Sequence, residues 1–395
     1  FEPIRDVVSM VKLKASYGLV GNDQIGGDRR FIYNETVIGG GKYYFGTTPS
    51  QYTSVRLGEF PNPNVGWEKA KKLNLGADLS FFNQLNISVD YFKENREGIF
   101  LQRKSIPMYV GLSTKPWVNI GKMRNSGIDA SLEYHQPLGK DLHLTVRGNF
   151  TYARNRIMDQ DEPDYAYTYM NHSGQMQWQK FGLVAAGLFQ DQEDIDSWAK
   201  QSFGEVKPGD IKYLDLNGDG IVDNYDTKPI GYSDIPEIVY GFGFSLQWKA
   251  FDLSAFFQGV AHVSFSTLTD QTQAFVGRNL KESSVFADLY GNTWTPENPG
   301  AKYPRMTTGA IDNNNQLSTF WMANGRYLRL KNLELGYTLP KRIANKIAMQ
   351  SLRVYLSGVN LFTFSPFKLW DPDLQTGATN YPNNRIINLG LTIGF

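Results

Sequence analysis

The feature that most constrains this chain is a period-two alternation of apolar and polar residues, repeated in about ten segments. One clear case carries apolar side chains at every second position, namely Ile238, Tyr240, Phe242, Phe244, Leu246 and Trp248. Such alternation predicts strands with one apolar and one polar face. The segments lie near 11–20, 67–82, 84–99, 118–136, 141–156, 237–249, 251–265, 322–338, 351–364 and 386–395.

The connections between these segments alternate between short and long. Short ones are Asn83, Pro137–Lys140, Ala250 and the segment 339–350, whereas long ones cover 21–66, 100–117, 157–236, 266–321 and 365–385. Outer-membrane barrels have short periplasmic turns and long extracellular loops. A soluble β-sandwich or propeller, the alternative for the same alternation, has no reason to place every long loop at one end. The pattern therefore predicts an all-β, antiparallel transmembrane β-barrel.

The last segment is an alternating strand that ends on an aromatic residue. Ile387, Leu389, Leu391, Ile393 and Phe395 share one face. An ordinary edge strand with that face in water would promote aggregation, which favours a barrel strand that faces lipid. A sheet in hydrocarbon must close, because unpaired backbone groups are costly there. We expect these ten strands to close with an upstream part of the protein.

Composition excludes several classes of function and is compatible with a membrane β-barrel. The chain has no Cys, which removes disulfides and thiolate chemistry, and its net charge of +1 does not indicate nucleic-acid binding. No stretch approaches the roughly 20 apolar residues of a transmembrane helix, but a membrane-spanning strand needs only about 9–11 residues. Phe1 begins a polar segment and not a signal peptide. An exported protein needs such a signal, so we expect an upstream segment.

Several long strings resemble one family, the SusC/RagA-like TonB-dependent transporters of the Bacteroidetes. They are PGDIKYLDLNGDGIVDNYDTKPI at 208–230, WTPENPGAKYPR at 294–305, YLRLKNLELGYTLP at 327–340, SLRVYLSGVNLFTF at 351–364 and NSGIDASL at 125–132. Residues 1–117 are less distinctive and resemble the family through LKASYGLVGN at 13–22.

The resemblance implies more than the alternation does. It implies the C-terminal part of a 22-stranded barrel with an N-terminal plug, which this chain does not contain. It also implies energy from a TonB complex, a SusD-like surface lipoprotein as partner, and glycans or oligopeptides as cargo. The expected location is the outer membrane of a Gram-negative bacterium of the Bacteroidetes, with outer-membrane lipid around the barrel.

An Asp-rich loop is the one candidate site with an explicit ligand spacing. Its oxygen-bearing residues Asp215, Asn217, Asp219, Asp223 and Asp226 occupy positions one, three, five, nine and twelve of an EF-hand-type loop, and Ile221 would contribute its backbone carbonyl. Ca²⁺ prefers six to eight oxygen ligands, and Gly220 permits the sharp turn. Asp at the last position, in place of the usual Glu, shortens the distance that this carboxylate can reach toward the ion. A solvated Asp/Asn/Gly turn is the alternative.

Loop aromatics are the next candidates, as ligand-binding residues: Tyr165, Tyr167, Tyr169, Trp178 and Trp198. Aromatic faces stack on ligands, and loops carry binding functions. The alternative is that they pack a core within the loop itself. A further set, Trp67, Trp117, Trp248 and Trp321, lies near predicted strand ends and suits an interfacial girdle.

No sequence pattern supports catalysis, so we predict no enzymatic activity. The four His are scattered, and no HExxH, GxSxG or P-loop motif is present. Asp161 and Glu162 form an acidic pair, but paired carboxylates in loops are usually solvated surface. The sequence therefore predicts an energy-coupled importer and receptor for nutrient uptake. The alternatives are a barrel that anchors loops for adhesion or complex assembly, and a barrel-embedded hydrolase.

Overall fold

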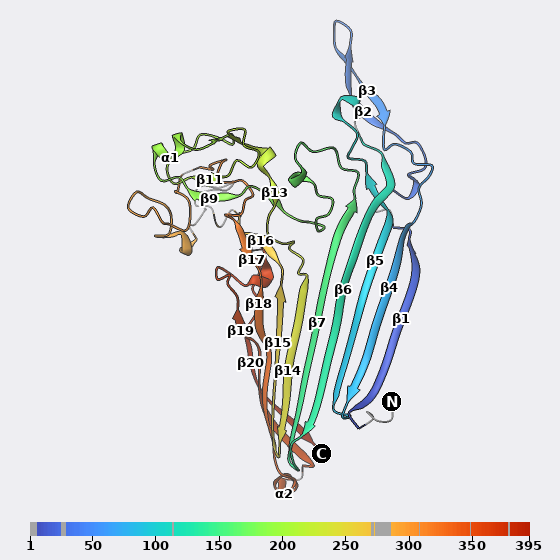
Figure 1. Ribbon diagram of the computed structural model, residues 1–395, viewed down its shortest axis with the longest axis vertical. Helices are drawn as coiled ribbons and strands as arrows, with labels where there is room; N and C mark the ends of the chain where they lie inside the picture. The colour runs from blue at the N-terminus through green and yellow to red at the C-terminus, as the bar shows by residue number, and fades with distance from the viewer. Residues whose placement is uncertain are drawn as a thin grey trace.

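Ten long strands form one antiparallel sheet in which each strand pairs with its neighbours in the chain (Figure 1). The computed structural model describes residues 6–24, 29–112, 114–269, 272, 286–307, 309–347, 349–377 and 380–395. The strands are β1 (Val8–Asn22), β4 (Glu68–Phe81), β5 (Leu85–Gln102), β6 (Trp117–Pro137), β7 (Leu142–Asp159), β14 (Ile238–Trp248), β15 (Phe251–Ala261), β18 (Tyr327–Thr338), β19 (Ser351–Phe364) and β20 (Ile386–Gly394). Their number and order confirm the sequence prediction.

The pairing register gives the sheet one apolar and one polar face. Leu246 of β14 pairs with Leu144 of β7 and with Leu253 of β15, so apolar side chains lie side by side across strands. Many of them are exposed, for example Leu13 at 79% and Leu389 at 77%. An apolar face of this extent is stable only against lipid or a partner.

The opposite face carries charged side chains that pair across strands. The Lys14 ammonium lies 2.7 Å from Asp78 and 3.0 Å from Asp90, and the Arg147 guanidinium lies 2.8 Å from Glu133. Hollows of about 460 and 550 Å³ are lined mostly by side chains of this polar face. It is therefore the water-facing side of the wall.

Short turns and long loops lie at opposite ends of the sheet, as the connection lengths predict (Figure 1). Between β4 and β5, Phe82 and Asn83 both have positive φ, and the Gln84 N–H donates to the Phe81 carbonyl oxygen, as in a type I′ turn. The segment 339–347 contains a short helix, α2 (Lys341–Ala344), and a 3₁₀ turn, η7 (Asn345–Ile347), at the turn end.

The long loops contain their own short elements. These are η2 (Arg29–Phe31), β2 (Val37–Phe45), β3 (Ser50–Leu57), η3 (Met108–Val110), η4 (Thr168–Met170), β8 (Phe181–Gly182), β9 (Ala185–Leu188), α1 (Gln192–Asp196), β10 (Lys200–Gln201), β11 (Ile211–Tyr213), β12 (Ile221–Val222), η5 (Asn224–Asp226), β13 (Lys228–Pro229), β16 (Ser264–Ser266), η6 (Ala287–Leu289), β17 (Met322–Asn324) and η8 (Pro372–Leu374).

Two predicted strands are interrupted. The predicted strand 251–265 breaks at His262, whose φ is +51°, and β16 follows the break. The predicted strand 322–338 divides into β17 and β18. A hairpin of β2 and β3 also occupies the segment predicted as a loop at 21–66.

One apolar core joins the loops 157–236 and 266–321. Its buried side chains are Leu183, Leu188, Ile211, Tyr213, Val222, Leu289, Trp294, Tyr303 and Trp321. The girdle prediction is wrong for Trp321, which is only 2% exposed because it packs in this core. Trp67 and Trp248 are 64% and 53% exposed, as a girdle requires.

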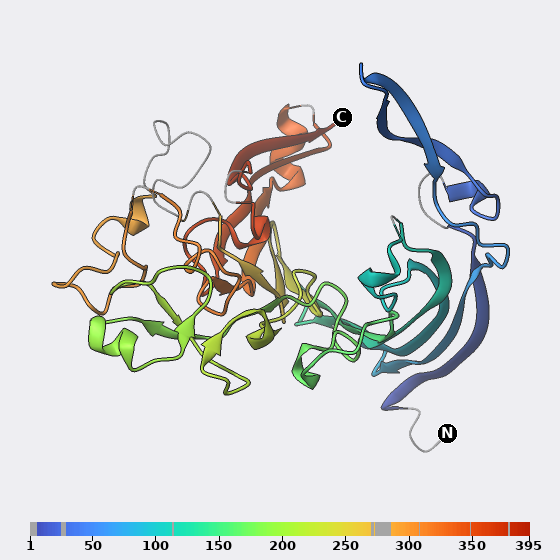
Figure 2. The same cartoon turned by 90° about the horizontal axis from the view of Figure 1, so that it is seen from above.

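The ten strands form an open arc when seen from the loop end (Figure 2). β1 and β20 are the two edges, and within the described residues neither pairs with a further strand on its outer side. Among those same residues, no helix has the length and apolar character needed to cross a membrane.

Candidate functional site: loops at one end of the barrel wall

A buried ion pair holds the two large loops together. Asp210 is fully buried, and its carboxylate oxygens lie 2.8 and 3.0 Å from the Nε and Nη2 atoms of Arg305. The Asn314 side chain and the backbone N–H of Lys207 also donate to Asp210. A buried carboxylate needs this many donors to offset its desolvation.

The same contact explains two of the strings that carry the family resemblance. Gly209, in the PGD string, has φ +90°, and a Cβ atom there would lie 2.4 Å from the Trp294 ring. Trp294 and Arg305 begin and end the WTPENPGAKYPR string. These two strings therefore form one structural unit, which sequence reasoning on separate strings did not find.

The Asp-rich loop is a series of turns that its own side chains stabilise. Asp215 accepts hydrogen bonds from the N–H groups of Gly218 and Gly220, at 2.7 and 2.8 Å. Both glycines have positive φ, at +78° and +84°. Asp219 accepts from the N–H of Ile221 at 2.8 Å.

The end of this loop is buried. Asp226 is inaccessible to solvent and accepts from the N–H groups of Leu216 and Asp223, at 2.6 and 2.8 Å. Asp223 in turn accepts from the N–H of Tyr225. The loop's own carboxylates thus stabilise its turns, and Asn217 takes part through its hydrogen bond with Asp219.

The carboxylates of this loop do not converge on one point. Across the described part of the chain, no group of three or more His, Cys, Asp or Glu side chains lies close enough to hold a metal ion. The Asp215, Asp219 and Asp226 side chains accept hydrogen bonds from the loop backbone, so they would have to change conformation to ligate one ion together. Ca²⁺ binding therefore stays a prediction.

Three of the five loop aromatics pack against neighbouring segments. Tyr167 and Tyr169 stack with ring centroids 5.4 Å apart, and the Tyr169 hydroxyl donates to the carbonyl oxygen of Tyr225 in the Asp-rich loop. Burial and nearby carboxylates raise the pKa of Tyr169. Trp198 donates its indole N–H to the Tyr213 carbonyl oxygen at 2.7 Å.

The other two predicted ligand-binding aromatics differ in exposure. Tyr165 is half-buried beside His172, with ring centroids 6.1 Å apart. Trp178 is 57% exposed and has a φ of +59°. Of the five, Trp178 is the one most open to a ligand, and ligand binding by the set stays a prediction.

In the acidic pair Asp161 and Glu162, the Asp161 carboxylate accepts several hydrogen bonds. Arg103 donates two hydrogen bonds to Asp161, and Lys104 and Ser105 donate their backbone N–H groups. Burial alone would raise the pKa of Asp161, but these donors outweigh it and hold the pKa below its ordinary value. A carboxylate held in the ionised form does not suit a general acid.

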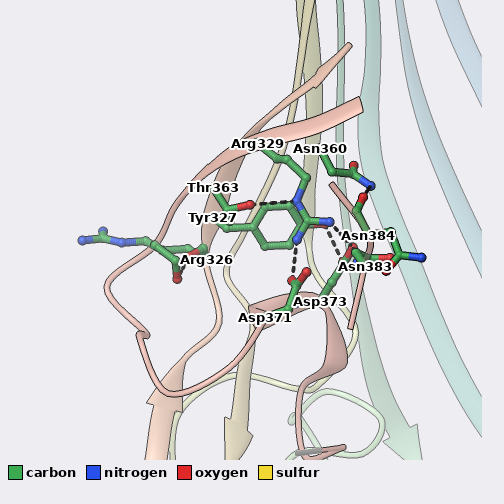
Figure 3. Close-up of polar contacts among 10 residues, drawn as sticks. Arg326, Tyr327, Arg329, Asn360, Thr363, Asp371, Asp373, Asn383 and Asn384 are labelled. Atoms are coloured by element: carbon green, nitrogen blue, oxygen red, sulfur yellow. Dashed lines mark hydrogen bonds and ion pairs between the residues drawn. The ribbon is translucent and has the colours of Figure 1, made fainter. Parts of the chain in front are cut away.

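A buried arginine ties the loop 365–385 to the polar face of the wall (Figure 3). Arg329 of β18 is 1% exposed and pairs in register with Thr363 of β19, whose hydroxyl accepts from Arg329 Nε at 3.1 Å. Its guanidinium contacts Asp371 and Asp373 of the loop. We refer to Arg329, Asp371 and Asp373 as the Arg329 clasp.

Further contacts extend the clasp to neighbouring segments. Tyr327 donates its hydroxyl to Asp373 at 2.6 Å, and the Gln375 side chain donates to the carbonyl oxygen of Asp234 before β14. Trp370 packs against Phe367 with ring centroids 4.7 Å apart. The loop is thereby folded over the polar face near the loop end of β14 to β19. No sequence signal identified the clasp, because its partners are more than 40 residues apart.

Comparison with known proteins identifies the family. The model of the TonB-dependent receptor-like β-barrel family matches residues 13–361. The chain belongs to this family. It is 29% identical to TonB-dependent receptor P3 of Formosa agariphila over 99% of its own length, and 26% identical to TonB-dependent receptor SusC of Bacteroides thetaiotaomicron over 99%.

The fold is also similar to a solved structure. A structure of the RagAB peptide importer in the open-open state aligns over 99% of the chain with a TM-score of 0.73 and 22% sequence identity, which shows the shared fold. The chain spans 40% of the length of receptor P3, 38% of SusC and 40% of the RagAB chain. The predicted SusC/RagA resemblance is confirmed.

Proposed function

We propose that this chain forms part of the wall of an energy-coupled importer in the outer membrane of a Gram-negative bacterium of the Bacteroidetes. The observation that carries the proposal is the two-faced, ten-stranded sheet of a TonB-dependent receptor family member. The apolar face suits contact with lipid, and the charged face suits a water-filled or plugged interior.

The open edges of the sheet support a larger assembly. In hydrocarbon, the outer edges of β1 and β20 would leave a row of backbone groups unpaired, at several kcal/mol each. We propose that further strands of the same protein close the barrel, that a plug fills it, and that a TonB complex supplies energy through the plug.

The cargo and the partner at the loop end can be proposed more closely. We propose glycans or oligopeptides as cargo and a SusD-like surface lipoprotein as the partner at the loop end. The similarity to SusC and the fold shared with a peptide importer support these assignments. The loops that would meet cargo first are the body built on the Asp210–Arg305 pair and the loop held by the Arg329 clasp.

Uptake measurements test the proposal. Cells that carry the complete protein should accumulate labelled oligomers too large for porins, and deletion of the TonB protein should abolish that uptake. Surface binding should persist in the deletion strain, because binding does not need energy. Uptake that is equal with and without TonB would reject energy-coupled import and favour a barrel that only anchors surface loops.

We also propose that Ca²⁺ stabilises the Asp215–Asp226 loop. The spacing of oxygen-bearing side chains and the left-handed backbone of Gly218 and Gly220 support it. By its position at the loop end, the site would face the outside medium, where millimolar Ca²⁺ suffices for a weak site. The ion would brace the loop and take no part in transport chemistry.

Ligand stacking on the loop aromatics is proposed chiefly for Trp178, because it is the exposed member of the set. Trp178→Ala should weaken binding of the cargo to the purified transporter, and Trp67→Ala, immediately before β4, serves as the control. Equal binding by the two variants would retire the idea.

A further inference from the structure

A hollow lined by both apolar and polar side chains lies between the segment around β17 and the start of the loop 365–385. Its volume is about 380 Å³, which suits a small organic group. Its lining includes the apolar side chains of Phe320, Met322, Ala323, Pro366 and Leu369. An apolar ligand group that covered these side chains would remove them from water, which is favourable.

Two of the charged side chains that line this hollow, Lys302 and Asp288, pair with each other. The Lys302 ammonium lies 2.5 Å from the Asp288 carboxylate, and the Tyr303 hydroxyl donates to the same carboxylate at 2.6 Å. Neither of these two charges is therefore free to attract a charged ligand group.

A cation without a carboxylate partner stands at the edge of the hollow. Lys368 is exposed and lines both this hollow and a second one of about 280 Å³. Arg385 also lines the second hollow. Within the described residues, no carboxylate lies within ion-pair distance of either cation, whereas Asp371 in the same lining is already paired with Arg329. The two hollows thus combine a group of apolar side chains with unpaired positive charge.

We propose that this pair of hollows binds the C-terminal residue of an oligopeptide, with an apolar side chain in the first hollow and the terminal carboxylate on Lys368. The inference rests on the proposed import function and assigns the cargo of that same loop end. A C-terminal residue carries its side chain and its carboxylate on one Cα atom, so it presents both groups to adjacent subsites.

The position of the site supports a role in cargo capture. The segment 366–369 belongs to the loop that the Arg329 clasp folds over the polar face, so the hollows open beside the interior of the wall. Phe367 packs against Phe265 with ring centroids 5.0 Å apart, which fixes the wall between the two hollows. A ligand end bound here would lie at the entrance to the conduit.

The test measures peptide binding by calorimetry to the complete transporter in detergent. The probe is Ala-Ala-Ala-Ala-Phe with a free C-terminal carboxylate, compared with its C-terminal amide. A charge-assisted hydrogen bond between carboxylate and ammonium predicts that amidation weakens binding by about tenfold or more. Lys368→Gln should weaken binding of the free acid by a similar factor and bind acid and amide equally. The control Lys140→Gln, in the turn between β6 and β7, should keep the full discrimination.

A second pair of measurements tests the apolar side chains of the first hollow. Replacing the last Phe of the probe by Gly should weaken binding by about tenfold, and Ala323→Phe, which fills the hollow, should remove that preference. Equal binding of acid and amide by the unmodified protein, or unchanged discrimination in Lys368→Gln, would overturn the proposal. Binding of an oligogalacturonate that depends on Lys368 would also overturn the peptide assignment.

These outcomes are separable from failure of the import function. Loss of TonB dependence in uptake, with acid–amide discrimination intact in detergent, would reject energy-coupled import and leave the peptide site standing. TonB-dependent uptake by a protein that binds acid and amide equally would reject the peptide site and leave import standing.

Discussion

Substitution of Asp210 by Ala should destabilise the joined loops far more than the barrel wall. The change removes a fully buried carboxylate and leaves the Arg305 guanidinium, the Asn314 amide and the Lys207 N–H without their partner. Breaking a buried ion pair in this way costs about 3–5 kcal/mol. The Arg305 side chain is 21% exposed, so water recovers part of its solvation and the low end of that range applies.

A cost of about 3 kcal/mol raises the population of the locally opened loops by roughly a hundredfold. Native-state hydrogen exchange at the buried strand β11, which follows Asp210 directly, measures this opening. Amides of Ile211 and Tyr213 should exchange about a hundredfold faster in Asp210→Ala, whereas amides in the middle of β6 should not change.

The matched control is Glu205→Ala. Glu205 lies in the same loop, its side chain is 84% exposed, and its nearest cation, Lys207, is 3.8 Å away. Such a surface pair contributes little, so exchange should change by less than about threefold. The double variant Asp210→Ala/Arg305→Met should recover part of the loss, because the stranded cation is gone. Equal exchange in Asp210→Ala and Glu205→Ala would refute this reasoning.

Three further predictions concern the other loops. Arg329→Met leaves the Asp371 and Asp373 carboxylates without their guanidinium partner. Protease cleavage within 365–385 should therefore rise about tenfold or more relative to the control Arg326→Met, which changes an exposed neighbour. Equal cleavage of the two variants would contradict the clasp. Burial lowers the pKa of His172 below its ordinary 6.5. The unfolded segment therefore binds more protons than the folded one. The contribution of neutral His172 to the stability of the folded loop is complete above pH 6.5 and is lost as the pH falls through the lowered pKa of the folded state. The protection of amides near Phe181, on which His172 stacks, should fall as the pH is lowered from above 6.5, once the intrinsic pH dependence of exchange is divided out, and His172→Phe should remove this loss. Removal of Ca²⁺ with a chelator should increase protease cleavage within 204–232. The variant Asp219→Asn should be cleaved equally with and without the chelator. If the chelator does not change cleavage of the unmodified protein, the Ca²⁺ site is rejected.

The wall of the barrel was predictable from the sequence because its signal is local. A strand with one face in lipid and one in water must alternate, and the alternation at residues such as Phe242 and Phe244 marks both the strand and its lipid face. The order of short and long connections then fixed which end carries the loops. Local backbone irregularities escaped this reasoning, as at His262, where a positive φ ends β15.

The loops were less predictable because distant contacts hold them. Asp210 and Arg305 are 95 residues apart, and Arg329 reaches Asp371 across 42 residues. Nothing in a period-two pattern indicates that a charged residue on a strand, such as Arg329, is buried by a returning loop. Trp321 was misassigned to a girdle for the same reason, since its burial depends on residues of another loop.

In the proposed importer, one face of this sheet meets lipid and the other does not. This chain contains no Cys, so single cysteines in β14 can each carry a spin label in the complete transporter reconstituted in lipid, once any Cys in the rest of that protein has been replaced. Labels at Phe242, Phe244 and Leu246 should be accessible to oxygen, which partitions into hydrocarbon, and labels at Gly243, Ser245 and Gln247 should not. An accessibility profile without this period of two, or with the opposite phase, would contradict the account.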